Sequence, residues 1–87
     1  MEVAFAPSFI RALKALPLEL QEEALEKIDA FQDIQNHKQL RVHALTGRLD
    51  GRFSFSVNFK TRIVFQFSSR KPKTAYLLMI GNHSIYQ

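Results

Sequence analysis

The stretch HALTGRLDGRFSFSVNFKTRIVF, residues 43–65, decides the fold of this chain. From Phe53 to Phe59, apolar side chains alternate with serine or asparagine, which is the two-residue period of a half-buried strand. A similar alternation follows Arg62 and continues to Phe67. Two such runs joined by a short loop predict an antiparallel hairpin.

The faces of this hairpin fix how its strands should pair. If Phe59 points into the core, its partner must do so too, because directly paired residues share a face. An odd-length loop achieves this with the pairs Phe59–Ile63, Val57–Phe65 and Phe55–Phe67. Arg62 then stands at the start of its strand, outside the core. The loop has no glycine to ease a tight turn, so a wider turn or a bulge is an alternative.

The segment before the hairpin predicts a short strand and two helices. Residues 2–5 alternate as a strand does, and Ser8 is a candidate N-cap for a first helix. Pro17 suits the first turn of a second helix, in which apolar residues recur at helical spacing up to Phe31. Residues 36–50 follow no clear period and are expected to form a loop.

A final apolar run, TAYLLMI at residues 74–80, predicts a central strand that ends at Gly81. The order of elements is then β-α-α-β-β-β. This is an α+β fold class in which two N-terminal helices pack on a small, mostly antiparallel four-stranded sheet. The last three strands should form an antiparallel meander, and the first should join it in parallel. A length of 87 residues predicts a single domain over residues 1–87.

Composition limits the class of protein. With 46% hydrophobic residues and three glycines, the chain should be globular rather than disordered. It contains no cysteine, which excludes disulfides and thiolate metal sites. It also shows neither an apolar run of about 20 residues nor a signal-peptide pattern, so a cytoplasmic location is expected.

Charge is divided unevenly along the chain. Residues 1–35 carry seven acidic and three basic side chains, whereas residues 36–87 carry one acidic and nine basic side chains. The C-terminal part therefore predicts a surface for a polyanion such as a nucleic acid. A basic face that is merely solvated is the alternative.

Antiparallel order brings several polar residues to one edge of the sheet. The start of the third strand should lie beside the end of the fourth, so Arg62 should be close to Gly81 and His83. The end of the second strand should lie there too. The expected group comprises Asn58, Lys60, Arg62, Asn82 and His83, with Tyr86 a few residues further on. Arg62 could contact a ligand at this edge or merely cap a turn.

Three short motifs add a resemblance to a known family. They are HALTGRLDG at residues 43–51, TRIVFQF at 61–67 and IGNHSIY at 80–86. In this order and spacing, the chain resembles the RelE/ParE toxin superfamily, the toxin halves of bacterial type II toxin–antitoxin pairs, over essentially its whole length. The resemblance implies a RelE-like endoribonuclease that cleaves messenger RNA on the ribosome, contacts ribosomal RNA and is neutralised by a cognate antitoxin.

The same resemblance implies a reaction without a metal ion or another cofactor. A base removes the proton of a ribose 2′-OH, the oxygen attacks the adjacent phosphate, and an acid protonates the leaving oxygen. Arg62 matches the arginine that contacts this phosphate in the family. His83 and His43 match histidines, a residue type that titrates near neutrality and can move protons. Tyr86 matches an aromatic position that stacks on or orients a base.

Further RNA contacts are expected from polar side chains near these four. They are Arg48, Arg52, Ser54, Ser56, Asn58 and Lys60. Ser54 and Ser56 depart from the family pattern, since they stand on the exposed side of the second strand, where members carry lysine or histidine. Serine can bind a phosphate but is a poor acid or base at pH 7. A ParE-like gyrase inhibitor that cuts no RNA and a catalytically inactive RNA-binding module of the same fold are the alternatives.

Overall fold

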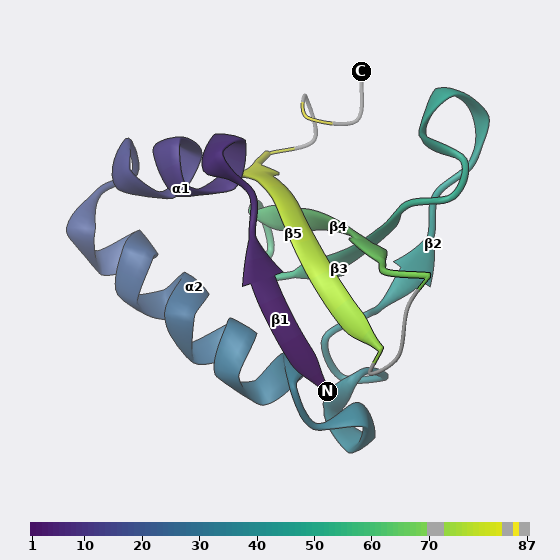
Figure 1. Ribbon diagram of the computed structural model, residues 1–87. Coiled ribbons are helices and arrows are strands. Elements are labelled where there is room, and N and C mark those ends of the chain that lie inside the picture. Colours follow the sequence, from purple (N-terminus) through teal and green to yellow (C-terminus); the bar gives the residue numbers. More distant parts are fainter. Residues whose placement is uncertain (70–72, 83–84, 86–87) are drawn as a thin grey trace.

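The described part of the chain, residues 1–69, 73–82 and 85 of a computed structural model, forms two α-helices and one five-stranded sheet (Figure 1). The helices are α1 (Pro7–Lys14) and α2 (Leu18–Phe31), and two short 3-10 turns are η1 (Ile34–Asn36) and η2 (Gly47–Leu49). The strands are β1 (Glu2–Phe5), β2 (His43–Ala44), β3 (Phe53–Ser56), β4 (Arg62–Phe67) and β5 (Thr74–Gly81).

The strands lie side by side in the order β1-β5-β4-β3-β2. β1 pairs with β5 in parallel, and the other neighbouring strands are antiparallel. The predicted α+β class, the parallel first strand and the C-terminal meander are therefore confirmed. The fifth strand is β2, which lies inside the predicted loop 36–50 and pairs His43 with Ser54 and Ala44 with Phe53. Two residues are too few to show a period in the sequence, so the expected sheet had only four strands.

The helix starts differ from the sequence-based expectation. α1 begins at Pro7, so Ser8 lies inside the helix and is not its N-cap. Ser8 Oγ instead donates a hydrogen bond to the carbonyl oxygen of Leu78 at 2.7 Å, which attaches α1 to the central strand β5. Pro17 occupies the N-cap of α2 rather than its first turn. Neither helix in the described ranges is long and apolar enough to span a membrane.

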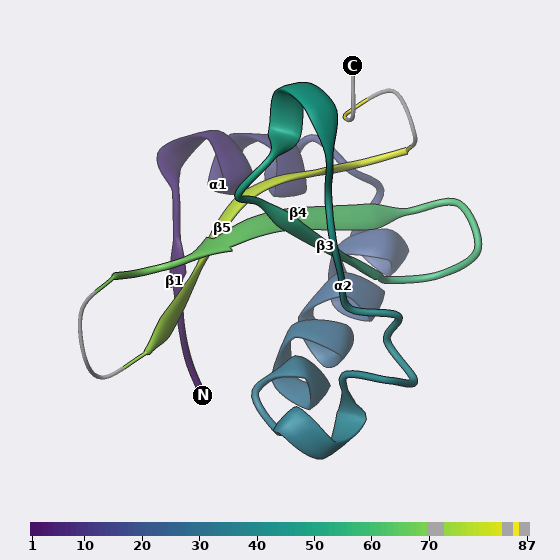
Figure 2. The ribbon, with the colours of Figure 1, turned by 90° about the vertical axis from the view of Figure 1, so that its right-hand side faces the viewer.

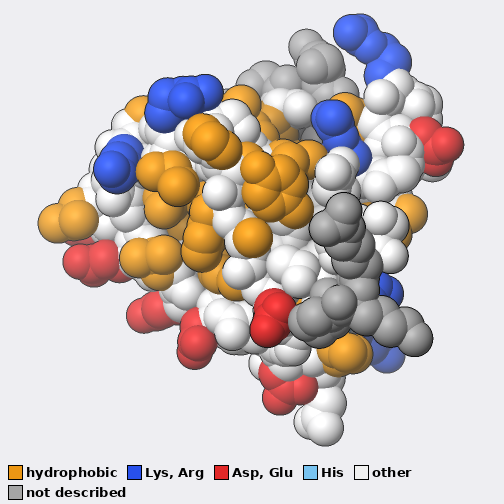
Figure 3. Space-filling model, viewed as in Figure 1, with side chains coloured by type: hydrophobic (Ala, Val, Ile, Leu, Met, Phe, Trp, Pro, Cys, Tyr) orange, Lys and Arg blue, Asp and Glu red, His pale blue; other side chains and the backbone are white. Residues whose placement is uncertain are grey.

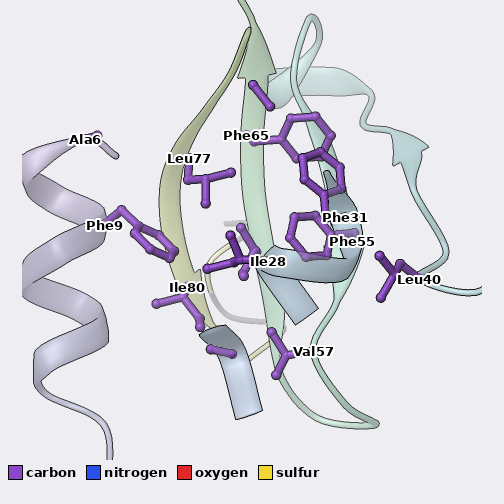
Figure 4. Packing of buried hydrophobic residues seen from close by; sticks show 13 residues of the cluster. Ala6, Phe9, Ile28, Phe31, Leu40, Phe55, Val57, Phe65, Leu77 and Ile80 are labelled. Carbon is purple, nitrogen blue, oxygen red and sulfur yellow. The ribbon is translucent and has the colours of Figure 1, made fainter. Parts of the chain in front are cut away.

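The core lies between α2 and one face of the sheet, and Phe9 of α1 closes it beside β5 (Figure 4). Phe31, the last residue of α2, stacks on Phe55 of β3 with ring centroids 4.4 Å apart. It also meets Phe65 of β4 edge-on at 4.9 Å. Such aromatic pairs add about 0.5–1.5 kcal/mol each beyond the area they bury. These contacts hold α2 against the two strands whose alternation predicted the fold.

The β3–β4 hairpin keeps the predicted faces but has a different register. The observed pairs are Phe53–Phe65, Ser54–Val64, Phe55–Ile63 and Ser56–Arg62. Ile63 therefore pairs with Phe55, four residues before the predicted partner Phe59. β3 ends at Ser56, residues 57–61 form the loop, and Phe59 is 89% exposed instead of buried. A shift of four residues preserves which side chains share a face, so the aromatic core survives the error in pairing.

The opposite face of the sheet is covered in part by the segment before β3 and by Ile85, which follows β5. A hollow on this face is lined by Ser8, Leu49, Arg52, Val64, Leu78, Met79 and Ile85. At the end of β5, a Cβ atom added to Gly81 would lie 2.5 Å from Ile85 Cγ2. The glycine therefore leaves the space that the Ile85 side chain occupies. Residues of this chain, rather than a partner, fill part of the second face.

Candidate functional site

The strand-opening arginine lies where three strands begin or end. Arg62 starts β4 and pairs with Ser56, the last residue of β3, on one side. On the other side it pairs with Gly81, the last residue of β5, so the predicted proximity of these two residues is confirmed. Figure 2 shows this edge at the right, where the loop of residues 57–61 projects beyond the sheet.

Two hollows border Arg62. One, of about 370 Å³, is also lined by Phe59, Lys60 and Asn82, and its lining is largely apolar. The other, of about 340 Å³, is lined by Arg41, Ser56, Asn58, Phe59 and Arg62. Both volumes fall at the lower end of the roughly 300–1,000 Å³ that ligand pockets span. We call the residues that line either hollow the Arg62 rim: Arg41, Ser56, Asn58, Phe59, Lys60, Arg62 and Asn82.

The Arg62 guanidinium is anchored through one nitrogen. Nη1 donates hydrogen bonds to the carbonyl oxygens of Asn58, at 2.6 Å, and Thr61, at 3.2 Å. Arg62 thus caps the hairpin loop, as one of the two expectations held. Both acceptors are neutral, and within the described residues no carboxylate pairs with Arg62. Because a guanidinium carries five N–H donors, the half-buried side chain keeps donors on Nε and Nη2 for a ligand.

Asn58 organises the loop that Arg62 caps. Its Oδ1 accepts hydrogen bonds from the backbone N–H groups of Lys60 and Thr61, both at 2.9 Å. Its Nδ2 donates to Glu23 Oε1 at 2.7 Å, which ties the loop to α2. Both polar ends of this side chain are therefore engaged within the protein. The side chain positions the loop whose Asn58 carbonyl holds Arg62, and the expected contact of Asn58 with RNA stays a prediction.

Two members of the Arg62 rim were missed by the sequence analysis. Phe59 was assigned to the core because it continues the alternation of β3. Arg41 was counted only as one of the basic residues, yet it lines a hollow together with Arg62. Its backbone adopts a left-handed conformation, with φ of 59°. No glycine or asparagine marks that conformation in the sequence, so no local signal would have found it.

His43 lies on the neighbouring strand β2 and is exposed. Its Nδ1 is 2.8 Å from the carbonyl oxygen of Arg41. A carbonyl can only accept, so Nδ1 carries the hydrogen and Nε2 of the neutral ring is the nitrogen able to take up a proton. Through Ser54 and Ser56, the pairing places His43 two strands and two residues from Arg62. Ideal strand spacings put their Cα atoms roughly 12 Å apart.

The two serines of β3 differ in exposure. Ser54 is fully buried between its cross-strand neighbours His43 and Val64. The expectation that it stands on an exposed side of the strand is therefore wrong, because β2 adds a neighbour that was not predicted. Ser56 is half-buried and lines the hollow beside Arg62 and Arg41. Of the two, only Ser56 has a place at the Arg62 rim.

The remaining basic residues of the expected RNA surface are exposed. They are Arg48, which lies in η2, Arg52 and Lys60. Lys60 lies at the Arg62 rim, whereas Arg52 lines the separate hollow with Leu49 and Ile85. Acidic side chains gather on α2, where Glu19, Glu22 and Glu26 are exposed (Figure 3). The separation of charge along the sequence thus places α2 as an acidic side of the molecule.

The other two predicted catalytic residues, His83 and Tyr86, lie outside the described residues. Their described neighbours are Asn82, which lines the hollow beside Arg62, and Ile85, which packs against the end of β5. Within the described ranges, no three His, Asp or Glu side chains are arranged to hold a metal ion.

Comparison with solved structures finds the same fold in toxin–antitoxin proteins. A chain of the RelBE2 toxin–antitoxin complex from Mycobacterium tuberculosis is 22% identical, with a TM-score of 0.73 over 94% of this chain and 96% of that chain. A chain of the archaeal RelE–RelB complex from Pyrococcus horikoshii is 19% identical, with a TM-score of 0.70 over 93% and 92% of the two chains. The YoeB/ParE toxin from Agrobacterium tumefaciens is 16% identical, with a TM-score of 0.65 over 95% and 99%.

The likeness is one of structure rather than of sequence. No protein-family model matches the chain, and no curated protein matches it. The structural matches nevertheless cover nearly the whole length of both chains in each comparison, at identities of 22% or less. The fold of this chain is that of the RelE/ParE toxin superfamily.

Proposed function

We propose that this chain is the toxin of a type II toxin–antitoxin pair and an endoribonuclease that cleaves messenger RNA on the ribosome. Its fold, shared with proteins described as toxins, supports the first part. The observation that supports endoribonuclease activity is how the Arg62 side chain is held and what it faces. This side chain is fixed by the loop through Nη1, faces two hollows and has no carboxylate partner among the described residues.

The reaction is an internal transesterification. A base takes the proton of a ribose 2′-OH, and the oxygen attacks the phosphorus of the adjacent 3′-phosphate. A pentacoordinate phosphorane with additional negative charge forms. The bond to the 5′-oxygen then breaks as an acid protonates that oxygen. The products are a 2′,3′-cyclic phosphate and a new 5′-OH end, and the reaction consumes no water or cofactor.

Arg62 is the group that would stabilise the phosphorane. The N–H donors that the loop does not use can bind two phosphate oxygens at once, since guanidinium matches phosphate geometry. Arg41 and Lys60, which line the hollows on either side, would hold neighbouring phosphates. Ser56 would donate a hydrogen bond to a phosphate oxygen from its hydroxyl.

The proton transfers are assigned to histidines. His83 follows Asn82 of the Arg62 rim in the chain, and His43 Nε2 is the free proton acceptor of its ring. In this proposal His83 acts at the phosphate held by Arg62, and His43 is the second group for proton transfer. Tyr86 orients the nucleotide, while Arg48 and Arg52 contact the RNA backbone.

The proposed partner that neutralises the toxin is a cognate antitoxin. Figure 3 shows apolar side chains gathered over α1 and β1, where Phe5 and Ile10 are both exposed. An amphipathic antitoxin segment would bury these side chains. Its acidic residues would pair with the basic C-terminal part.

The test is to map RNA ends after brief induction of the chain in bacterial cells that carry a reporter message. Primer extension should reveal new 5′ ends inside the reading frame for the wild type. Arg62→Ala should lower their rate of appearance by about 100-fold or more, because one charged phosphorane contact is lost. Arg11→Ala is the matched control, since Arg11 is an exposed base on α1 that lines neither hollow beside Arg62, and its loss should not change cleavage.

Arg62 also braces the loop, so its effect on folding must be separated from its effect on chemistry. Thermal unfolding of Arg62→Ala and Arg62→Lys shows whether the fold persists, and the lysine variant retains the charge. If the wild-type chain arrests growth while the message stays intact, the proposed cleavage is wrong and gyrase inhibition of the ParE type takes its place. An intact message without arrest would leave an RNA-binding module that lacks catalysis.

A further inference from the structure

Phe59 is the most exposed large apolar side chain among the described residues, at 89%. Single exposed apolar residues are common on protein surfaces and need no function. Phe59 differs because its loop is held in place. The backbone N–H of Val57 donates to the carbonyl of Thr61 at 2.9 Å, and Asn58 Oδ1 accepts from the backbone N–H groups of Lys60 and Thr61. The exposed ring therefore belongs to a loop whose backbone is held by hydrogen bonds.

Cationic side chains line both hollows beside the ring. Phe59 lines the hollow that contains Lys60 and Arg62 and also the hollow that contains Arg41 and Arg62. A groove for an apolar helix would instead present a row of apolar neighbours. An aromatic face flanked by arginine and lysine is the pattern that binds unpaired bases by stacking and their phosphates by charge.

We propose that Phe59 is the platform on which an unpaired base of single-stranded RNA stacks, while Arg62 and Arg41 hold the phosphates on either side of that base. The inference rests on the proposed function and adds to it a residue that determines where the strand lies. The largely apolar hollow beside Lys60 and Asn82 takes the edge of the base. Stacking tolerates any base, so this contact supplies affinity and position rather than sequence preference.

The experiment measures binding of a short single-stranded oligoribonucleotide that cannot be cleaved. The probe is a fluorescein-labelled 12-residue RNA of mixed sequence with 2′-O-methyl riboses, followed by fluorescence anisotropy. Phe59→Ala should raise the Kd by about 5- to 150-fold, the range that corresponds to roughly 1–3 kcal/mol for one stacked base. Phe59→Trp should bind as well as the wild type, whereas Phe59→Leu should remain weak because it restores apolar area without an aromatic face.

A second readout distinguishes stacking from charge. Phe59→Ala should leave the slope of log Kd against log salt concentration unchanged, since no phosphate contact is lost. Arg41→Ala should reduce the slope by about 0.7 for the one contact removed. Leu18→Ala is the control for exposed apolar area, because Leu18 is 68% exposed and lies at the start of α2. It should change neither quantity.

Four results would overturn the proposal. Equal affinity of Phe59→Ala and the wild type would remove the stacking role, and rescue by leucine would replace stacking with simple apolar contact. If Phe59→Ala keeps its RNA affinity but no longer inhibits growth, the ring contacts a protein partner and not RNA. Failure of the wild type to bind the oligonucleotide would also end the proposal. The mapping of message ends decides the proposed endoribonuclease activity independently of all four.

Discussion

Phe55 and Phe59 stand four residues apart in one alternating run, yet the chain buries the first completely and leaves the second 89% exposed. Phe55 belongs to β3, which is paired on both sides, and its ring stacks on the last residue of α2. At Phe59 the strand has ended, because Asn58 binds the following backbone N–H groups with its side chain. One asparagine therefore separates a side chain that stabilises the fold from one that is free for a ligand.

Alanine substitutions at the two positions should produce the largest contrast. Phe55→Ala should lower the free energy of unfolding by about 3–5 kcal/mol, because it leaves a cavity in an aromatic cluster. Phe59→Ala should change it by less than about 0.5 kcal/mol. Urea denaturation followed by circular dichroism measures both values. Similar losses in the two variants would mean that Phe59 contributes to the core in solution.

Removal of the asparagine itself should have an intermediate effect. Asn58→Ala removes the acceptor for two loop N–H groups and leaves the half-buried Glu23 without its hydrogen-bond donor. The free energy of unfolding should fall by about 1–3 kcal/mol. Hydrogen exchange of the Lys60 and Thr61 amides should become faster.

Glu23→Gln is the matched control for the asparagine variant, since the amide oxygen can still accept the hydrogen bond from Asn58. Its unfolding free energy and loop exchange rates should stay close to those of the wild type. Protection of the Lys60 and Thr61 amides that persists in Asn58→Ala would show that the loop conformation does not depend on this side chain.

A small effect on stability is expected at Arg41, and it should have the opposite sign. Arg41→Gly relieves the left-handed backbone at φ of 59°, which outweighs the greater freedom of glycine in the unfolded chain. The free energy of unfolding should rise by about 0.5–1 kcal/mol while RNA binding weakens. Arg41→Lys should keep both the strain and most of the binding. A glycine variant of lower stability would show that the observed backbone carries no strain.

The sequence was sufficient for features that depend on period or on chain direction. The bounds of β4 and β5 agree with the predicted runs that begin at Arg62 and Thr74. The proximity of Arg62 and Gly81 was also predictable, because antiparallel order alone brings the start of one strand beside the end of the next. The error in the predicted β3–β4 register did not affect that inference. Arg62 and Gly81 are paired through β5, which lies on the other side of β4 from β3.

Features set by a single tertiary contact could not be predicted. β2 forms because His43 and Ala44 find a partner in β3, although nothing periodic marks them. The alternation of residues 53–59 gave no sign that the strand stops at Ser56, because asparagine fits the polar position of the pattern. Because residues 57–61 form a loop where a strand was predicted, Phe59 lies at the Arg62 rim and not in the core. The roles of His83 and Tyr86 stay predictions.

The hydrogen bonds from Arg62 Nη1 to the loop have an entropic consequence for any anion that binds there. A free arginine side chain loses about 2 kcal/mol of rotamer entropy when it is fixed around a ligand. In this protein the carbonyls of Asn58 and Thr61 fix the guanidinium as the chain folds. The entropy cost of ordering Arg62 is then part of the free energy of folding. A phosphate that binds to this preorganised guanidinium does not lose affinity to that cost.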